Sequence, residues 1–195
     1  MSRPKNVLLI GDSIRMGYDK EIRKALDGRA NVVFPEDNCQ FAAYVCRYFH
    51  EWFDGVDGKD FDVIHWNAGL HDVLCLFGEE PNTPLEIYEY YIERICKRIK
   101  KLCPNAKVIF ATSTSVLTEK MAEDFKRYNE DIEKYNEAAV RIVAKYGFAV
   151  NDLYAVSKTL PEEARSDAVH YYTDMGTEAY SKQVLEYINA ALDNN

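Results

Sequence analysis

Five short apolar runs, separated by longer segments with a helical period, constrain the fold of this chain more than any other feature. The runs are rich in β-branched and aromatic residues and end in polar or turn residues; they cover 6–10, 31–34, 62–66, 107–111 and 148–151. Continuous apolar runs of this length are typical of parallel strands that are covered on both faces. The pattern therefore predicts a parallel sheet with helices on each side.

The segments between the runs support this prediction. Over 85–102, Ile87, Tyr91, Ile95, Ile99 and Leu102 recur every three or four residues and form one apolar helix face. Further helices are expected over 41–53, over 121–146 with a break near Asn129, and over 174–192. Alternating strands and helices require right-handed crossovers between parallel strands. We expect a single domain over 1–195, a three-layer α/β/α sandwich around a five-stranded, doubly wound, flavodoxin-like sheet.

Composition and charge narrow the function. The chain of 195 residues has 24 Lys and Arg against 32 Asp and Glu, a net charge of −8 that opposes nucleic acids and anionic lipid surfaces. No apolar stretch approaches the ~18 residues of a membrane span, and the first apolar run is too short for a signal peptide. We therefore expect a cytoplasmic protein with no membrane insertion and no nucleic-acid partner. The five cysteines are scattered and predict buried thiols.

Ligands of doubly wound sheets bind beyond the carboxyl ends of the strands, and the first such end is followed by Gly11-Asp12-Ser13-Ile14. Serine in this loop often caps the next helix. It is also placed to act as a nucleophile, because helix N–H groups beside it stabilise a developing oxyanion. Both interpretations of Ser13 remain open at this point.

The tetrapeptide Asp167-Ala168-Val169-His170 precedes the last expected helix. An aspartate three residues before a histidine can turn back to accept the imidazole N–H, which leaves the other ring nitrogen free as a base. The same four residues are compatible with a surface turn. Ser13 and His170 both belong to the carboxyl edge of the expected sheet, so the two side chains can meet.

These two blocks resemble the SGNH hydrolases, also called GDSL esterases and lipases. Gly11-Asp12-Ser13-Ile14 is similar to their first block and Asp167-Ala168-Val169-His170 to their last. The resemblance implies a serine ester hydrolase that acts on short acyl esters of small alcohols or carbohydrates. Ser13 would attack, His170 would act as base and Asp167 would orient it, without a cofactor.

The middle blocks depart from that family. Its members have a glycine after the second strand whose N–H joins the oxyanion hole, but this chain reads Asn38-Cys39-Gln40 there, so the N–H of Cys39 or Gln40 is the expected donor. After the third strand the family has an asparagine donor, where this chain offers His71, or Asn67 four residues earlier. We favour Asn67, because a carboxamide donates at any pH.

Two alternatives follow from these departures. One is a protein of the same fold that hydrolyses weakly or not at all and binds acylated sugars. In the hydrolase itself, Arg15, Tyr18 and Trp66 lie near the expected mouth of the site and are candidates to face a sugar. The other is a metal-dependent hydrolase with His65, His71 and Asp72 as ligands, although these residues lack the usual ligand spacing. The oligomeric state and the identity of the ester are not predicted.

Overall fold

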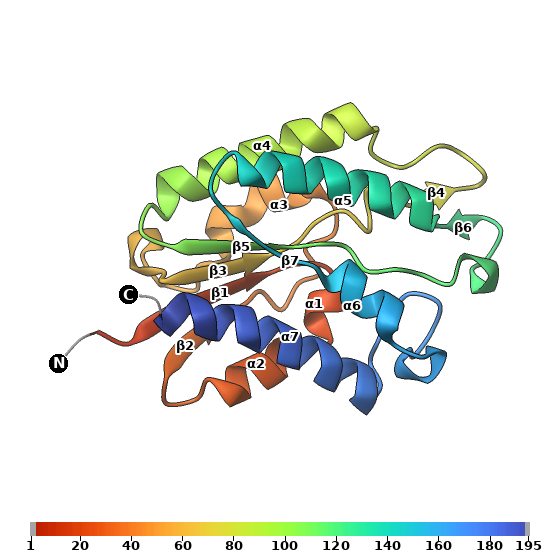
Figure 1. The fold of residues 1–195 in the computed structure, drawn as a ribbon. Coiled ribbons are helices and arrows are strands. Elements are labelled where there is room, and N and C mark those ends of the chain that lie inside the picture. The colour runs from red at the N-terminus through yellow and green to blue at the C-terminus, as the bar shows by residue number, and fades with distance from the viewer. Residues whose placement is uncertain (1–2, 194–195) are drawn as a thin grey trace.

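The computed structural model describes residues 3–193, and its centre is a five-stranded parallel sheet (Figure 1). The strand order is β2-β1-β3-β5-β7, the doubly wound order of flavodoxin-like folds. The predicted fold class is therefore confirmed. The strands are β1 (Lys5–Ile10), β2 (Ala30–Val33), β3 (Val63–Trp66), β5 (Lys107–Ala111) and β7 (Ala149–Asn151).

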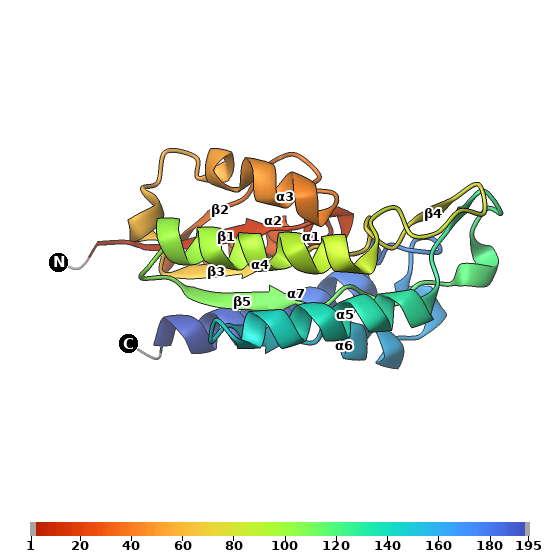
Figure 2. The same ribbon diagram turned by 90° about the horizontal axis from the view of Figure 1, so that it is seen from above.

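Helices cover both faces of this sheet (Figures 1 and 2). One face carries α3 (Ala42–Tyr48), α4 (Leu85–Leu102) and α5 (Asn129–Ala144), with α4 packed between the other two. The opposite face carries α2 (Asp19–Ala25) and α7 (Asp174–Asp193), which contact each other. The short helices α1 (Ser13–Met16) and α6 (Leu153–Thr159) begin close to the carboxyl ends of β1 and β7.

The core explains why the five runs are continuously apolar. Val7, Leu8, Leu9 and Ile10 of β1 are all completely buried, so both faces of this strand lack solvent. In such a strand every side chain is buried, so apolar residues stabilise it at every position rather than at alternate positions. All five cysteines are buried free thiols, as expected. Within residues 3–193, no helix has the length and apolar character to cross a membrane.

Two expected helices differ from the structure. The segment predicted as helical over 121–146 becomes helical only at Asn129, whose side chain bonds the backbone N–H and carbonyl of Val116. Before it, β6 (Phe125–Lys126) pairs antiparallel with β4 (Cys75–Leu76). Residues 122–125 are exposed, so no apolar face stabilises a helix there. The helix expected over 41–53 ends at Tyr48 and continues as the 3₁₀ turn η1 (Phe49–Trp52).

Three more 3₁₀ turns lie in the connections: η2 (Gly58–Asp60), η3 (Thr118–Lys120) and η4 (Glu162–Ala164). The carboxyl ends of the strands point to the right in Figure 1. The β4–β6 ribbon, α1 and the loop before α7 all lie at this end of the molecule. This edge therefore carries every segment in which the sequence predicted functional residues.

Candidate active site

Ser13 opens α1 immediately after β1, and it is not the residue that caps the helix. Asp12 is the N-cap, and its Oδ1 accepts the N–H of Ile14 at 2.9 Å. The alternative in which Ser13 serves only as a cap is therefore wrong. Ser13 itself is half-buried, and its hydroxyl is free for another partner.

That partner is His170. Its Nε2 lies 2.8 Å from Ser13 Oγ, and its Nδ1 lies 2.8 Å from Asp167 Oδ2. Because a carboxylate only accepts hydrogen bonds, Nδ1 carries the proton and Nε2 is the acceptor for the serine hydroxyl. The structure thus brings together the three residues that the first and last motifs predicted, in the order required for proton transfer from serine.

The Asp167 carboxylate is held in its charged form by several donors. Burial acts to raise its pKa, but hydrogen bonds from the His170 and Val169 N–H groups and from the His170 ring outweigh burial and lower the pKa. Asp167 Oδ1 accepts both backbone bonds, which leaves Oδ2 for the ring. The D-x-x-H turn therefore builds its own geometry from local bonds.

A second layer of contacts fixes this turn to the loop after β5. Arg165 donates to the carbonyl and the hydroxyl of Ser115, the Tyr171 hydroxyl donates to the same carbonyl, and the Leu117 N–H donates to the carbonyl of Ala168. Sequence analysis missed these residues because they are distant in the chain and belong to no short motif.

Tyr172 links the two halves of the site. Its ring stacks on the His170 imidazole, with centroids 4.9 Å apart at 27°, and its hydroxyl donates to the Ser13 carbonyl at 2.6 Å. Tyr172 also packs against Gly17, where an added Cβ would come within 2.8 Å of the ring. One side chain therefore spans the nucleophile and the base.

Asn67, the favoured oxyanion donor, donates to the Asp12 side chain. It is only 5% exposed and its Nδ2 donates to Asp12 Oδ2 at 3.2 Å. The space it occupies depends on Gly11, because a Cβ at that position would lie 1.9 Å from Asn67 Oδ1. Asn67 therefore uses one of its two amide N–H groups to brace the Asp12 cap, and its role as oxyanion donor stays a prediction.

The loop after β2 also differs from expectation. The Cys39 N–H donates to the Gly11 carbonyl at 3.2 Å, and the Gln40 N–H donates to Asn38 Oδ1 at 2.9 Å. Both N–H groups proposed for the oxyanion hole therefore have other partners. Gln40 has a φ of +46°, a conformation that glycine adopts most easily, which marks where the family's glycine would fit.

Arg15 explains why this loop is held so firmly. It is 1% exposed, pairs with Asp19, and donates to the carbonyls of Pro35 at 3.0 Å and Asp37 at 2.7 Å. The suggestion that Arg15, Tyr18 and Trp66 face a sugar is therefore wrong, because all three are buried. Arg15 instead ties the loop after β2 to α1.

His71 is the other candidate donor. It is half-buried, and no hydrogen bond of its ring occurs within residues 3–193. Burial lowers its pKa; the charge of Asp12 opposes this shift, and the charges of Arg127 and His170 add to it. His71 is therefore neutral near pH 7, with one ring N–H to donate, and it lies in the electrostatic field of the Ser13 helix cap and of His170.

The metal alternative does not hold. The buried His65 contacts Asn151 through Nε2 at 3.2 Å, and burial lowers its pKa to about 3. Asp72 accepts the N–H of Ala42 through its carboxylate instead. No group of three or more His, Cys, Asp or Glu side chains among residues 3–193 is arranged to hold a metal ion. His65, His71 and Asp72 are therefore not a ligand set.

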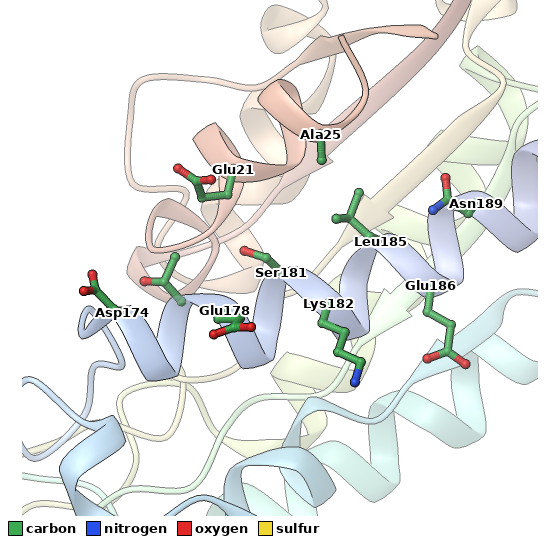
Figure 3. Close-up of a pocket in the computed structure, with 10 residues that line it drawn as sticks. Glu21, Ala25, Asp174, Glu178, Ser181, Lys182, Leu185, Glu186 and Asn189 are labelled. Carbon is green, nitrogen blue, oxygen red and sulfur yellow. The ribbon is translucent and has the colours of Figure 1, made fainter.

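A hollow also lies away from the Ser13 edge. A groove of about 800 Å³ runs between α2 and α7 and contains none of the predicted site residues (Figure 3). Glu21, Asp174, Glu178 and Glu186 project around it, together with Lys182. The contacts among Ser13, His170 and Asp167 lie outside this groove, so the Ser13 edge remains the candidate active site.

Comparison with known proteins agrees with this fold. No family model and no curated protein matches the sequence. Solved structures do match. An acetyl xylan esterase has a TM-score of 0.73 and 17% sequence identity, over 94% of this chain and 99% of that chain. A lipase/acylhydrolase from Enterococcus faecalis has a TM-score of 0.74 and 17% sequence identity, over 95% of this chain and 96% of that chain. An acetylxylan esterase from Geobacillus stearothermophilus also matches, with a TM-score of 0.69 and 16% sequence identity over 94% of each chain.

These structural neighbours are esterases and acylhydrolases of the SGNH/GDSL type, the family that the Gly11–Ile14 and Asp167–His170 motifs resemble. At 16–17% identity the likeness concerns the fold, and it extends over 94–99% of each chain. The motifs, the strand order and the neighbours agree. The chain shares the fold of these esterases and acylhydrolases.

Proposed function

We propose that the protein is a serine-dependent ester hydrolase that removes short acyl groups, with Ser13 as nucleophile, His170 as base and Asp167 as the residue that orients His170. The observation that carries this proposal is the pair of 2.8 Å contacts made by the two nitrogens of His170. One nitrogen of the His170 ring contacts a serine hydroxyl and the other contacts a carboxylate, which is the contact order of a catalytic triad. This arrangement activates a hydroxyl for attack on a carbonyl.

In the proposed reaction, Ser13 Oγ attacks the ester carbonyl while its proton moves to His170 Nε2. The resulting imidazolium is stabilised by Asp167 and returns the proton to the leaving alcohol. Water then repeats the sequence on the acyl-enzyme and releases the acid. The positively polarised start of α1 lies beside the nucleophile, so it favours the negative charge that develops on the carbonyl oxygen.

Two donors are proposed for that oxygen. The first is the Ser13 N–H, which has no hydrogen-bond acceptor within residues 3–193 because Asp12 caps Ile14 instead. The second is the ring N–H of His71, which also lacks a partner in this range. A neutral imidazole can donate without carrying a charge into the site, and the lowered pKa of His71 favours that form.

The substrate class follows from size and from the neighbours. Within residues 3–193, no separate domain covers the Ser13 edge to shelter a long acyl chain. Two of the neighbours described above are acetyl xylan esterases. We therefore propose short acyl groups, acetyl first, on small or carbohydrate alcohols.

A panel of 4-nitrophenyl acetate, butyrate and octanoate, together with acetylated xylo-oligosaccharides, tests this function. Rates are expected to fall as the acyl chain lengthens, and activity is expected to depend on Ser13. The competing possibility is a sugar-binding protein without hydrolytic activity. It would show saturable binding of the acetylated sugar with no release of acetate and no reaction of Ser13 with a fluorophosphonate.

A further inference from the structure

Arg127 follows β6 and carries a guanidinium that is almost completely buried, with only 4% of the residue exposed. Its Nε donates to the carbonyl of Leu70 at 2.5 Å, so the head of this arginine lies against the loop after β3. Leu70 directly precedes His71. The end of the β4–β6 ribbon therefore places a positively charged side chain beside the loop that carries His71, although Arg127 and Leu70 are 57 positions apart in the chain.

The charge of this guanidinium is not neutralised by a hydrogen-bonded acid. Within residues 3–193 no carboxylate pairs with Arg127, and its two terminal nitrogens have no hydrogen-bond acceptor. Neither terminal nitrogen is a fully buried atom without a partner, so both keep some contact with solvent. A buried arginine without an anion is costly, because a guanidinium has five donors and always carries charge.

Electrostatics place this cation in the same site as the serine. The charge of Asp12, the residue before Ser13, acts to raise the pKa of Arg127. The charges of Arg127 and His170 both act to lower the pKa of His71. Asp12 makes no hydrogen bond to Arg127 within residues 3–193; its carboxylate oxygens accept the N–H of Ile14 and the amide of Asn67. The terminal nitrogens of Arg127 therefore remain available on the His71 side of the site.

We infer that Arg127 binds an anionic group of the substrate, so that the enzyme prefers esters that carry a carboxylate near the scissile bond. This inference rests on the proposed ester hydrolysis. With Nε bonded to Leu70, the edge formed by the two terminal nitrogens presents parallel donors that match the two oxygens of a carboxylate. The anion belongs to the acyl group or to the alcohol, and the experiment separates these two sources.

Two matched pairs of esters provide the test. On the acyl side, 4-nitrophenyl hydrogen glutarate is compared with the neutral 4-nitrophenyl glutaramate. On the alcohol side, 4-acetoxybenzoate is compared with 4-acetoxybenzamide. In at least one pair, kcat/KM for the anionic ester is expected to exceed that of its neutral partner roughly tenfold to a hundredfold, mainly through KM. Equal values within both pairs would overturn the inference and leave the hydrolytic function intact.

Variants assign the preference to a side chain. Arg127→Gln is expected to reduce the ratio of kcat/KM between the anionic and the neutral ester to about one, whatever its effect on the neutral ester, and Arg127→Lys is expected to retain part of the ratio. The matched control is Lys126→Gln, which removes the neighbouring positive charge, paired with Glu123, and is expected to keep the preference. Equal loss in Lys126→Gln, or a parallel loss for anionic and neutral esters in Arg127→Lys, would contradict a direct contact.

A binding measurement makes the inference independent of turnover. Glutarate and benzoate are titrated calorimetrically into the Ser13→Ala protein, with glutaramide and benzamide as neutral controls. Saturable binding of either anion that is lost in Ser13→Ala/Arg127→Gln supports the site even if no ester is hydrolysed. No binding of either anion would overturn it even if the neutral esters are good substrates.

Discussion

The two sides of the candidate active site are built in different ways. On the Ser13 side, each of the three reacting groups has a short contact to the next, and Asp167 and His170 are organised by bonds within four residues. On the opposite side, where an oxyanion would lie, Asn67 and the Cys39 N–H are used to brace the structure. A proton-transfer arrangement is thus complete in one region, while in the other the Cys39 N–H and one amide N–H of Asn67 bond to the protein itself.

This difference shows which parts of a site tolerate replacement. Attack and proton transfer need particular atoms, so serine, histidine and a carboxylate are required. An oxyanion needs only N–H groups at suitable positions, and a backbone amide, an imidazole or a carboxamide can provide them. The loop after β3 offers more than one such N–H group. Asn67 packs against Gly11 and bonds Asp12, while the ring of His71 has no hydrogen-bond partner within residues 3–193.

The largest expected effect tests the Ser13 side. Ser13→Ala is expected to lower the rate of ester hydrolysis roughly 10⁴-fold or more, because the nucleophile is lost. Its melting temperature should stay close to that of the parent, since Asp12 rather than Ser13 caps α1. Steady-state kinetics and thermal unfolding measure the two effects, and covalent labelling by a fluorophosphonate should disappear.

Ser166→Ala is the matched control, because this exposed serine lies on the same loop as His170 and its hydroxyl contacts none of the three reacting side chains; within residues 3–193 it accepts only the N–H of Tyr172, at 3.3 Å. It should retain labelling and activity. Residual hydrolysis above a few per cent in Ser13→Ala would show that the serine mechanism is wrong.

The next effect tests the oxyanion side. His71→Ala is expected to lower kcat roughly a hundredfold with little change in KM, because a donor to the oxyanion acts mainly in the transition state. Asn67→Ala is expected to act on stability instead. It removes the buried bond to Asp12 and leaves that carboxylate oxygen without its partner, at a cost of about 1–3 kcal/mol.

Kinetics and urea unfolding on both variants separate these roles, with His50→Ala as a control for an exposed histidine distant from the site. The reverse pattern, with kcat lost in Asn67→Ala and kept in His71→Ala, would return the donor role to Asn67.

The sequence predicted the regular part of the molecule well because its signals are local. All five strands lie within one or two residues of the predicted runs, and the helix Leu85–Leu102 was bounded correctly by its apolar period. The D-x-x-H turn is equally local. By contrast, the bond from Arg127 to Leu70 and the bonds from Arg165 to Ser115 join residues at least 50 positions apart. No periodicity or motif marks such pairs, and a two-residue strand such as β6 has no period at all.

A pH-dependent effect tests the support of the oxyanion side. Burial raises the pKa of Asp72 to about 7, despite the bonds that its carboxylate accepts. Between pH 4 and 7 the folded state then holds a proton that the unfolded state has released, so stability falls as pH rises through this window. Asp72→Asn removes this dependence, by up to about 1.4 kcal/mol per pH unit. Urea unfolding at pH 4.5, 5.5 and 6.5 measures it, and parallel curves for the two proteins would contradict the raised pKa.

The smallest expected effect concerns Tyr172, the residue that joins the nucleophile to the base. Tyr172→Phe removes the hydrogen bond to the Ser13 carbonyl and keeps the stacking on His170, so activity should fall less than about fivefold. Tyr172→Ala also removes the stacked ring and should cost more, because the imidazolium formed during attack loses an aromatic face beside it.

The pair of variants therefore separates two roles of one side chain. If the ring matters most, Tyr172→Phe resembles the parent in kcat and Tyr172→Ala is clearly slower, with Met175→Ala as an exposed neighbouring control. If the hydroxyl matters most, the two variants are equally impaired, and the Ser13 side then depends on how the serine backbone is held. Equal activity of all three proteins would show that the short contacts between Ser13, His170 and Asp167 hold this side without the help of Tyr172.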